Sequence, residues 1–329
     1  MIMKLDDKVT SSQVVLYGKT WFAEEAARQY PAMRILATCD ARELEDDSYF
    51  LGLESSSGGG RPVVIFCKTL DVPLDELRLL MNRCHAARFA CFDVYGKELA
   101  RCLSDAALSH IEAQRRTWAD HTFDDIKALI DAYDVVSFDI FDTLVGRTVS
   151  SPEDVFDLVE NMAQAEGIDI EGFRKLRHNA QLESGLDNAN LDEVYQELIQ
   201  VAGVPAQEAN HLKRLEIEAE KKVMVPKEQV IRLAEYAHNQ GKEVILTTDM
   251  YLNEPYLVEL LQNVGFMGYD DIIISCEHRK LKLEGLFDDL RLAYPGKRVI
   301  HFGDSYINDC VCAEMASIDS FLIPLEAAR

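Results

Sequence analysis

Short apolar runs alternate with amphipathic patterns along the first part of the chain. Between these runs, apolar positions recur at helical spacing, as over residues 74–81. Strands that alternate with helices are typical of a parallel sheet, so we expect residues 1–120 to form a Rossmann-like α/β domain. The runs rich in β-branched and aromatic residues predict strands at residues 13–17, 34–38, 61–68 and 89–92.

A different pattern starts near residue 121. A short apolar run at 135–138 predicts a buried strand, and apolar positions at helical spacing follow it. Helix-start signals within this second pattern are Ser151-Pro152, Asn190 and Pro205. Because no convincing strand occurs among these helices, we expect residues 149–223 to be an all-helical insert.

Buried strands return after the insert. One lies within residues 243–252 and others at 271–275 and 298–302. Short continuous apolar strands of this kind are buried on both faces of parallel sheets. We therefore expect residues 121–148 and 224–329 to form one doubly wound parallel sheet that the helical insert interrupts.

Composition narrows the class of protein. The chain has 329 residues, is 48% hydrophobic and carries a formal net charge of -23. Such a charge repels nucleic acids and anionic membranes, and a phosphorylated ligand would need a local cation. No apolar run is long enough to cross a bilayer, and no secretory leader is visible. Eight scattered cysteines fit reduced thiols, so we expect a cytoplasmic protein.

The turn after the first predicted strand has only part of a dinucleotide-binding motif. It carries one glycine, Gly18, where the motif uses three. Trp21 and Phe22 would obstruct the close approach of a phosphate. We therefore expect residues 1–120 to be a scaffold that contacts a protein partner, with nucleotide binding as the alternative.

Polar residues follow four predicted strands of the second part. They are the acids Asp139 and Asp142, the hydroxyls Thr247 and Thr248, a basic loop at 279–282, and the acids Asp304 and Asp309. The carboxyl ends of the strands of a doubly wound sheet meet at one crevice. Phosphoryl transfer to an aspartate needs such a set, since a hydroxyl and a lysine stabilise the phosphoryl oxygens while further acids hold Mg²⁺.

With these motifs, residues 134–329 resemble the haloacid dehalogenase (HAD) superfamily. Phe138-Asp-Ile-Phe-Asp-Thr-Leu144 resembles its first motif, and Thr248-Asp249 the second. Lys282 fits the third motif, and Gly303-Asp304 to Asp309 the fourth. The residues of these motifs are similar to those of one branch of the superfamily, whose members often accompany glycosyltransferases and surface-polysaccharide assembly proteins. The resemblance implies a HAD-type core with an inserted helical cap and hydrolase activity.

The resemblance also implies roles for single residues. Asp139 would be the nucleophile that forms an aspartyl-phosphate. Thr248 would bind the phosphoryl oxygens, with Thr247 as the alternative. Lys282 would neutralise the nucleophile and the phosphate together, with Lys280 as the rival lysine.

A magnesium site is implied by the same resemblance. Asp304 would be the main Mg²⁺ ligand, together with Asp139 and the backbone carbonyl of Phe141. Asp309 would either belong to the ligand shell of the metal or hold Lys282 in place.

One position departs from the phosphatase pattern. Family phosphatases place an acid two residues after the nucleophile, where this chain has Phe141, and Asp142 would face away in a structural role. Our leading hypothesis is a Mg²⁺-dependent hydrolase of a small phosphorylated metabolite, with sugar and polyol phosphates as the candidates. The alternatives are a catalytically weak binding or regulatory module of surface-polysaccharide metabolism and, from Phe141, a dehalogenase-like hydrolase.

Several other residues have both a structural and a functional interpretation. Packing is the first expectation for His301, and for Tyr251 packing and lining the pocket are equal alternatives. Arg147 would lie exposed or reach a substrate anion, and Arg177 and His178 would face the site only as a minor alternative. The charged run at 216–222 predicts a solvated helix face.

Overall fold

The chain divides into two compact units, Met1–His110 and Ile111–Arg329. The computed structural model describes residues 12–46, 48–56, 62–67, 74–93, 99, 116–184 and 189–323. The division falls before the boundary expected at residue 120. The reason is that the amide of Leu322 donates to the carbonyl of Arg116 at 2.8 Å and Thr117 pairs with Leu322, which ties these residues to the second unit.

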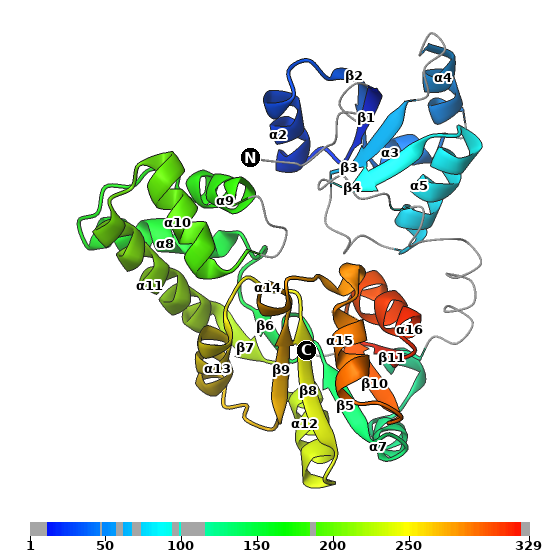
Figure 1. The fold of residues 1–329 in the computed structure, drawn as a ribbon, viewed down its shortest axis with the longest axis vertical. Coiled ribbons are helices and arrows are strands. Elements are labelled where there is room, and N and C mark those ends of the chain that lie inside the picture. Colours follow the sequence, from blue (N-terminus) through cyan, green and yellow to red (C-terminus); the bar gives the residue numbers. More distant parts are fainter. Residues whose placement is uncertain are drawn as a thin grey trace. The chain divides into compact units, whose positions relative to one another are not determined.

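The described residues of the first unit contain a parallel sheet in the order β2-β1-β3-β4 (Figure 1). Its elements are β1 (Gln13–Tyr17), α2 (Trp21–Gln29), β2 (Arg34–Cys39), α3 (Ala41–Leu44), α4 (Tyr49–Ser56), β3 (Val63–Phe66), α5 (Leu74–Ala86) and β4 (Ala90–Asp93). The expected alternation of parallel strands and helices is confirmed. The order, however, is not the dinucleotide-binding one, because β2 and β3 flank β1 on opposite sides instead of following each other on one side.

The second unit contains a five-stranded parallel sheet in the order β11-β10-β5-β8-β9. The strands are β5 (Val135–Phe138), β8 (Glu243–Thr248), β9 (Asp271–Ile274), β10 (Val299–Gly303) and β11 (Asp319–Leu322). The parallel α/β prediction is confirmed, and β11 is an addition to the predicted strands. β5 is the central strand, with Phe138 level with Leu246 on one side and Phe302 on the other.

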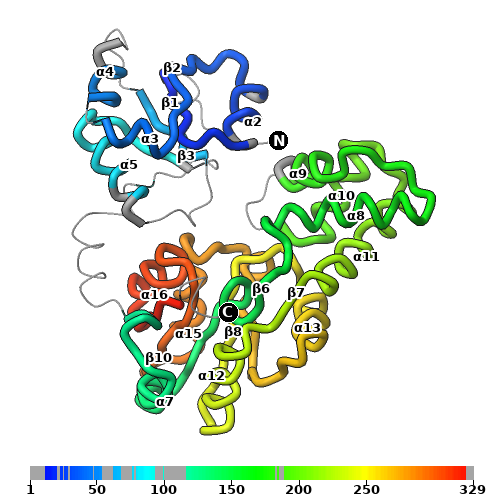
Figure 2. The backbone as a smooth tube through the Cα atoms, turned by 180° about the vertical axis from the view of Figure 1, so that it is seen from behind, coloured from blue at the N-terminus to red at the C-terminus, as the bar shows by residue number. Residues whose placement is uncertain are grey.

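Both faces of this sheet are buried, and Figure 2 shows from behind the helices on one side of it. Val136 and Phe138 belong to one core cluster, whereas Val135 belongs to another that also contains Leu286 and Leu290 of α15. Alternate residues of β5 therefore bury on opposite faces, which explains its continuous apolar run. The covering helices include α7 (Phe123–Asp131), α12 (Glu228–Asn239), α13 (Glu254–Asn263), α14 (Ser275–His278), α15 (Leu286–Ala293) and α16 (Cys312–Met315).

The segment between β6 (Val145–Arg147) and β7 (Met224–Pro226) is helical in its described residues. β6 and β7 pair antiparallel, so the chain leaves and re-enters the core side by side. Asn190 starts one helix with a capping box, because its side chain accepts from the amide of Glu193 while Glu193 accepts from the amide of Asn190. The helices are α8 (Asp154–Ala165), α9 (Phe173–Glu183), α10 (Leu191–Ala202) and α11 (Ala206–Val223).

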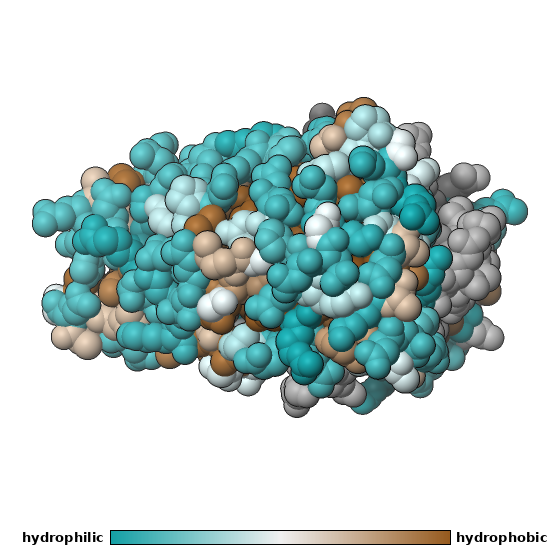
Figure 3. All heavy atoms as spheres, turned by 90° about the horizontal axis from the view of Figure 1, so that it is seen from below, coloured by the Kyte–Doolittle hydropathy of each residue, from teal (hydrophilic) through white to brown (hydrophobic). Residues whose placement is uncertain are grey.

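Three further features of the described residues bear on the expectations from composition: the polarity of the surface, membrane-spanning helices and disulfides. The face seen in Figure 3 is mainly hydrophilic, with hydrophobic residues in small groups. Among the described residues, no helix is both long and apolar enough to pass through a bilayer. The cysteines in the described part of the chain form no disulfide.

Candidate active site

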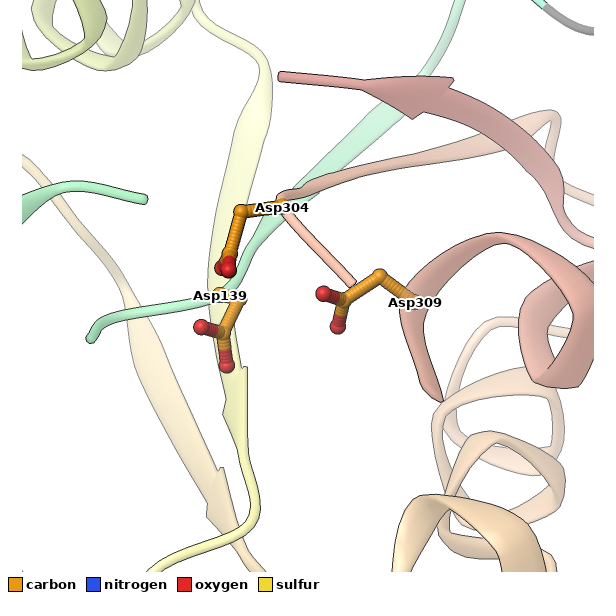
Figure 4. A group of neighbouring side chains, drawn as sticks. All are labelled: Asp139, Asp304 and Asp309. Carbon is orange, nitrogen blue, oxygen red and sulfur yellow. The ribbon is translucent and has the colours of Figure 1, made fainter. Parts of the chain in front are cut away.

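Three aspartates meet at the carboxyl edge of the second sheet. The amide of Asp139 still donates to the carbonyl of Phe302 at 2.9 Å, so its carboxylate emerges directly beside the end of β10. Asp304 follows that strand, and Asp309 reaches toward both from the next helical turn (Figure 4). One carboxylate oxygen from each of the three lies within 4.8 Å of the others. The structure thus brings Asp139 together with Asp304 and Asp309, which lie far from it in the sequence.

Lys282 is the lysine of this cluster. Its Nζ lies 2.6 Å from Oδ1 of Asp139 and 2.5 Å from Oδ1 of Asp309, and its side chain is buried. Its backbone amide donates to Asp249 at 2.9 Å, which holds the loop against the end of β8. Lys280 instead pairs with Asp289 at 2.7 Å on a side chain that is 43% exposed. Of the two candidate lysines, only Lys282 contacts the acids.

The two candidate threonines end β8 differently. Thr247 Oγ1 lies 2.9 Å from Oγ of Ser137, so its hydroxyl belongs to a buried polar group under the acids. Thr248 is the last residue of the strand and is also buried. Because Thr247 is engaged below the edge, Thr248 is the better candidate for contact with a ligand.

His301 connects that buried polar group to the acids. Its Nδ1 lies 2.8 Å from Ser137 Oγ and its Nε2 lies 3.1 Å from Asp309 Oδ1. With Ser137 as the donor to Nδ1, the imidazole is neutral and donates its Nε2–H to Asp309. The core histidine expected from the sequence is therefore also a support for the acid cluster. Only the register of β5 and β10, which pairs His301 with Ser137, reveals this.

Asp309 is held on both of its oxygens. Oδ1 accepts from Lys282 and His301, and Oδ2 accepts from the amide of Ser305 at 2.9 Å. It also packs so closely on Gly303 that an added Cβ there would lie 2.2 Å from Asp309 Cγ. Of the two roles expected for Asp309, the hold on Lys282 is the one with direct contacts.

A tight turn after Asp139 adds a hydroxyl that sequence reasoning did not single out. The amides of Leu144 and Val145 both donate to the carbonyl of Ile140, at 2.9 and 3.0 Å. Thr143 is consequently buried and donates to Asp304 Oδ1 at 2.9 Å. Its place in the first motif was the available signal.

Asp142 shapes the same turn. Its φ of 58° lies in the left-handed region, which costs a non-glycine residue free energy. Its carbonyl accepts a hydrogen bond from the Lys227 ammonium. Asp142 is absent from the group of carboxylates around Asp139, in keeping with the structural role expected for it.

Burial of several acids around one ammonium shifts their protonation. Burial raises the pKa of Asp139 to about 7 against the opposing effect of Lys282. Burial and the neighbouring charges of Asp309 and Asp139 raise the pKa of Asp304 to about 8. Burial also acts to raise the pKa of Asp309, but Lys282 and His301 outweigh it and hold this pKa well below its usual value. The site therefore has a deficit of positive charge that a bound cation would remove.

The donor set fits a hard divalent cation. Mg²⁺ prefers carboxylate and carbonyl oxygens, and Asp139 and Asp304 supply two such carboxylates at one edge. The backbone carbonyl of Phe141 lies in the turn directly after Asp139 and remains a predicted ligand. Asp309 would act from behind these ligands, since its oxygens already accept hydrogen bonds.

The ring of Phe141 packs against a guanidinium group. The Arg147 guanidinium carbon lies 4.3 Å from the centre of the Phe141 ring. Arg147 is also paired with Glu220 through two contacts of 2.9 Å, and its side chain is only 10% exposed. The expectation of an exposed loop arginine is wrong, because α11 covers this residue.

A second buried arginine lies in the helical insert. Arg177 pairs with Glu216 of α11 at 2.9 and 3.0 Å, and its guanidinium carbon lies 4.8 Å from the ring centre of Tyr251. The solvated face predicted at 216–222 is wrong for Glu216 and Glu220, which are both buried. His178 packs edge-on against Phe156, with ring centres 5.4 Å apart.

No protein-family model and no curated protein matches the chain. Solved structures similar to it include a HAD phosphatase from Thermococcus onnurineus, at 16% identity over 60% of this chain and 88% of that one, with a TM-score of 0.40. A defluorinating L-2-haloacid dehalogenase is 16% identical over 58% and 80%, with a TM-score of 0.41. A HAD-family enzyme from Bacteroides thetaiotaomicron is 14% identical over 58% and 93%, with a TM-score of 0.41. Identities this low say nothing about a shared reaction or substrate.

Proposed function

We propose that the second unit is a Mg²⁺-dependent hydrolase of the HAD type that acts on a small phosphorylated metabolite. One observation carries this proposal: Lys282 bridges Asp139 and Asp309 in a buried cluster that also holds Asp304, at the carboxyl edge of a parallel sheet. An attacking carboxylate, a lysine and metal-binding acids at one edge are the parts that phosphoryl transfer to an aspartate requires.

The reaction would proceed in two displacements. An oxygen of Asp139 forms a bond to phosphorus while the bond from phosphorus to the leaving alcohol breaks, which gives an aspartyl-phosphate. A water then attacks this phosphorus, releases phosphate and restores Asp139. Lys282 neutralises Asp139 and the phosphoryl oxygens, and Thr248 donates to one of those oxygens. Bound Mg²⁺ would supply further charge stabilisation, held by Asp139, Asp304 and the Phe141 carbonyl.

Because Phe141 replaces a general acid, the first displacement lacks a proton donor for the leaving alcohol. A general acid contributes on the order of 10²–10⁴ in rate, and the residue two positions after Asp139 cannot donate a proton. The leaving alcohol would take its proton from water or from the substrate itself. We therefore expect a slow enzyme or one that acts on esters of good leaving groups.

The helices α8–α11 would form a cap over the site. The amide of Leu191 in α10 donates to the carbonyl of Tyr251 at 2.7 Å, and Arg279 pairs with Glu193 through two contacts of 2.7 Å. These contacts support a cap that meets the loops around Thr248 and Lys282 and excludes water there. The resemblance to the polysaccharide-associated branch supports a sugar or polyol phosphate as the substrate. We further propose that the first unit binds a protein partner.

A screen of phosphate esters with and without Mg²⁺ tests this function. We expect Mg²⁺-dependent phosphate release by the wild type and none above background by Asp139→Asn. Asp142→Asn is the matched control, because it removes a neighbouring carboxylate that lies outside the acid cluster. Equal turnover by the wild type and Asp139→Asn would refute the hydrolase and favour the binding module.

Phe141 also favours a second candidate, a dehalogenase-like attack of Asp139 on carbon. This reaction displaces halide, needs no proton donor at position 141 and needs no metal. Incubation of the metal-free protein with 2-haloacids separates the two reactions. Release of halide that is lost in Asp139→Asn would support the dehalogenase, and its absence would support the phosphoryl-transfer proposal.

A further inference from the structure

Two buried arginine–glutamate pairs involve helix α11 of the helical insert: Arg147 of β6 pairs with Glu220, and Arg177 of α9 pairs with Glu216 within the insert. Arg147 and Arg177 each donate two hydrogen bonds to one glutamate of α11, Glu220 and Glu216, at 2.9 to 3.0 Å. The two glutamates lie one helical turn apart, so α11 presents both from one face. Their side chains are 1% and 0% exposed.

These pairs lie against residues that flank the site. Arg147 stacks on Phe141, which comes two residues after Asp139. Arg177 stacks on Tyr251, which comes three residues after Thr248. Under the proposed function, Phe141 occupies the place from which an acid would face the leaving group. Arg147 is thus a guanidinium that lies directly against the residue at this place.

Glu220 occupies the Nε and Nη2 edge of this guanidinium and balances its charge. A carboxylate or second phosphate on the leaving group that bound this edge would have to displace Glu220 from a two-point pair. Glu220 would then remain charged and buried without a partner, which is strongly unfavourable. The same holds for Glu216 and Arg177.

Other described cations around the site are engaged as well. Lys282 contacts Asp139 and Asp309, and Lys227 donates to a backbone carbonyl. Arg279 pairs with Glu193 and Lys280 with Asp289. The cations named here, all in the part of the chain that the structure describes, therefore each have a partner.

We propose that Glu220 is a specificity-determining residue: by occupying Arg147, it restricts the enzyme to phosphate monoesters whose leaving group carries no second anionic group. This inference rests on the proposed phosphoryl-transfer function and narrows its substrate class. Neutral sugar and polyol phosphates fulfil the condition, whereas bisphosphates and phosphorylated carboxylic acids do not.

A matched pair of substrates tests the inference. Glycerol 3-phosphate and 3-phosphoglycerate are both esters of a primary hydroxyl, and they differ in that a carboxylate replaces a hydroxymethyl group. We expect kcat/KM of the wild type to be more than tenfold higher for glycerol 3-phosphate. Glu220→Gln removes the charge opposite Arg147 and is expected to shift this ratio at least about tenfold toward 3-phosphoglycerate, the scale of a close charge pair.

Glu208→Gln is the control, because Glu208 lies exposed on the same helix and the substitution changes net charge equally. It is expected to leave the ratio unchanged. A ratio that Glu220→Gln does not move, or a wild type that prefers 3-phosphoglycerate, would overturn the inference. If Glu220→Gln does not fold, the wild-type ratio alone decides. Absence of Mg²⁺-dependent turnover of every phosphate ester would instead count against the proposed function.

Discussion

Asp40 in the first unit and Asp139 in the second occupy the same position relative to a strand. Each directly follows a buried or partly buried strand of a parallel sheet. Asp40 caps the next helix, since its side chain accepts from the amide of Ala41 at 2.8 Å and Glu43 closes the capping box. Asp139 caps no helix and instead contacts Lys282. The same residue at the same kind of strand end serves local structure in one unit and a candidate active site in the other.

The remaining strand ends differ in the same way. In the first unit, Tyr17 stacks on Phe66 with ring centres 5.8 Å apart, and the neighbouring Cys39 and Cys67 are buried. Burial raises the pKa of both thiols to about 12, so they stay neutral. At the same edge, Lys19 pairs with Glu43, and these side chains are 56% and 25% exposed. In the second unit the paired charges, Lys282 with Asp139 and Asp309, are buried. The two parallel sheets thus differ in whether the charged groups at the edge are buried, and buried clusters of this kind are typical of functional sites.

The largest expected effect separates Lys282 from its neighbour Lys280. Lys282→Met leaves Asp139 and Asp309 without their shared ammonium, so we expect kcat/KM for p-nitrophenyl phosphate to fall by about 10³ or more. Lys280→Met removes an exposed ion pair and is expected to change it less than about twofold. Loss of activity in both variants, with folding intact, would contradict the assignment of the site lysine.

Alanine substitution of one glycine in each unit tests the comparison by the free energy of unfolding. Gly303→Ala places a Cβ against Asp309, and we expect it to lower the free energy of unfolding by about 1–3 kcal/mol. Gly52→Ala in α4 meets nothing within 4 Å and is expected to raise it by about 0.5–1 kcal/mol, because alanine favours a helix. Urea unfolding followed by circular dichroism measures both. An unaffected Gly303→Ala would show that Asp309 is not held where the structure has it.

His301 tests whether the buried polar group supports the acids. His301→Leu removes the donor to Asp309 and is expected to lower kcat about 10–100-fold with a smaller change in KM, as for other residues that orient active-site groups. His301→Gln retains a donor and should recover part of kcat. Identical losses in the two variants would indicate that His301 acts through packing alone.

Protonation of the acid cluster predicts a pH dependence of the second unit. The pKa values of Asp139 and Asp304 are raised from an ordinary 3.8 to about 7 and about 8. At a pH between the ordinary and the raised values, the folded state therefore holds more protons than the unfolded chain. Stability of the metal-free second unit should therefore fall as pH rises from about 4 to 8. Because Mg²⁺ competes with these protons, millimolar Mg²⁺ should raise Tm more at pH 8 than at pH 6. Asp304→Asn should reduce this difference, and a shift independent of pH would contradict the cation site.

The smallest effect is expected at Asp40. Asp40→Ala removes a helix cap and should cost about 0.5–2 kcal/mol of stability in the first unit while activity stays unchanged. Proteolytic susceptibility of the first unit and the phosphate-release assay measure the two outcomes. An activity loss like that of Asp139→Asn would end the distinction between the two aspartates.

Local patterns of the sequence were enough to locate most elements of the second unit. The apolar runs at β5, β8 and β10 are short and continuous, and the acids directly follow them. Parallel pairing then places Asp139 and Asp304 at one edge, because strand ends of the same direction meet there. The helical insert was equally visible, since its apolar positions repeat at a helical period and Asn190 starts a helix with its capping box.

Contacts between distant segments had no such signal. Glu216 and Glu220 stand in a highly charged run that is chemically suited to a solvated surface, and only the packing of α11 selects the face that meets Arg177 and Arg147. The link from Ser137 through His301 to Asp309 depends on strand register. The order of β1, β2 and β3 likewise depends on which strands pair. The periodicity of a sequence shows which side of one segment is buried. Which strands pair, and which residues a helix face meets, depend on two segments together.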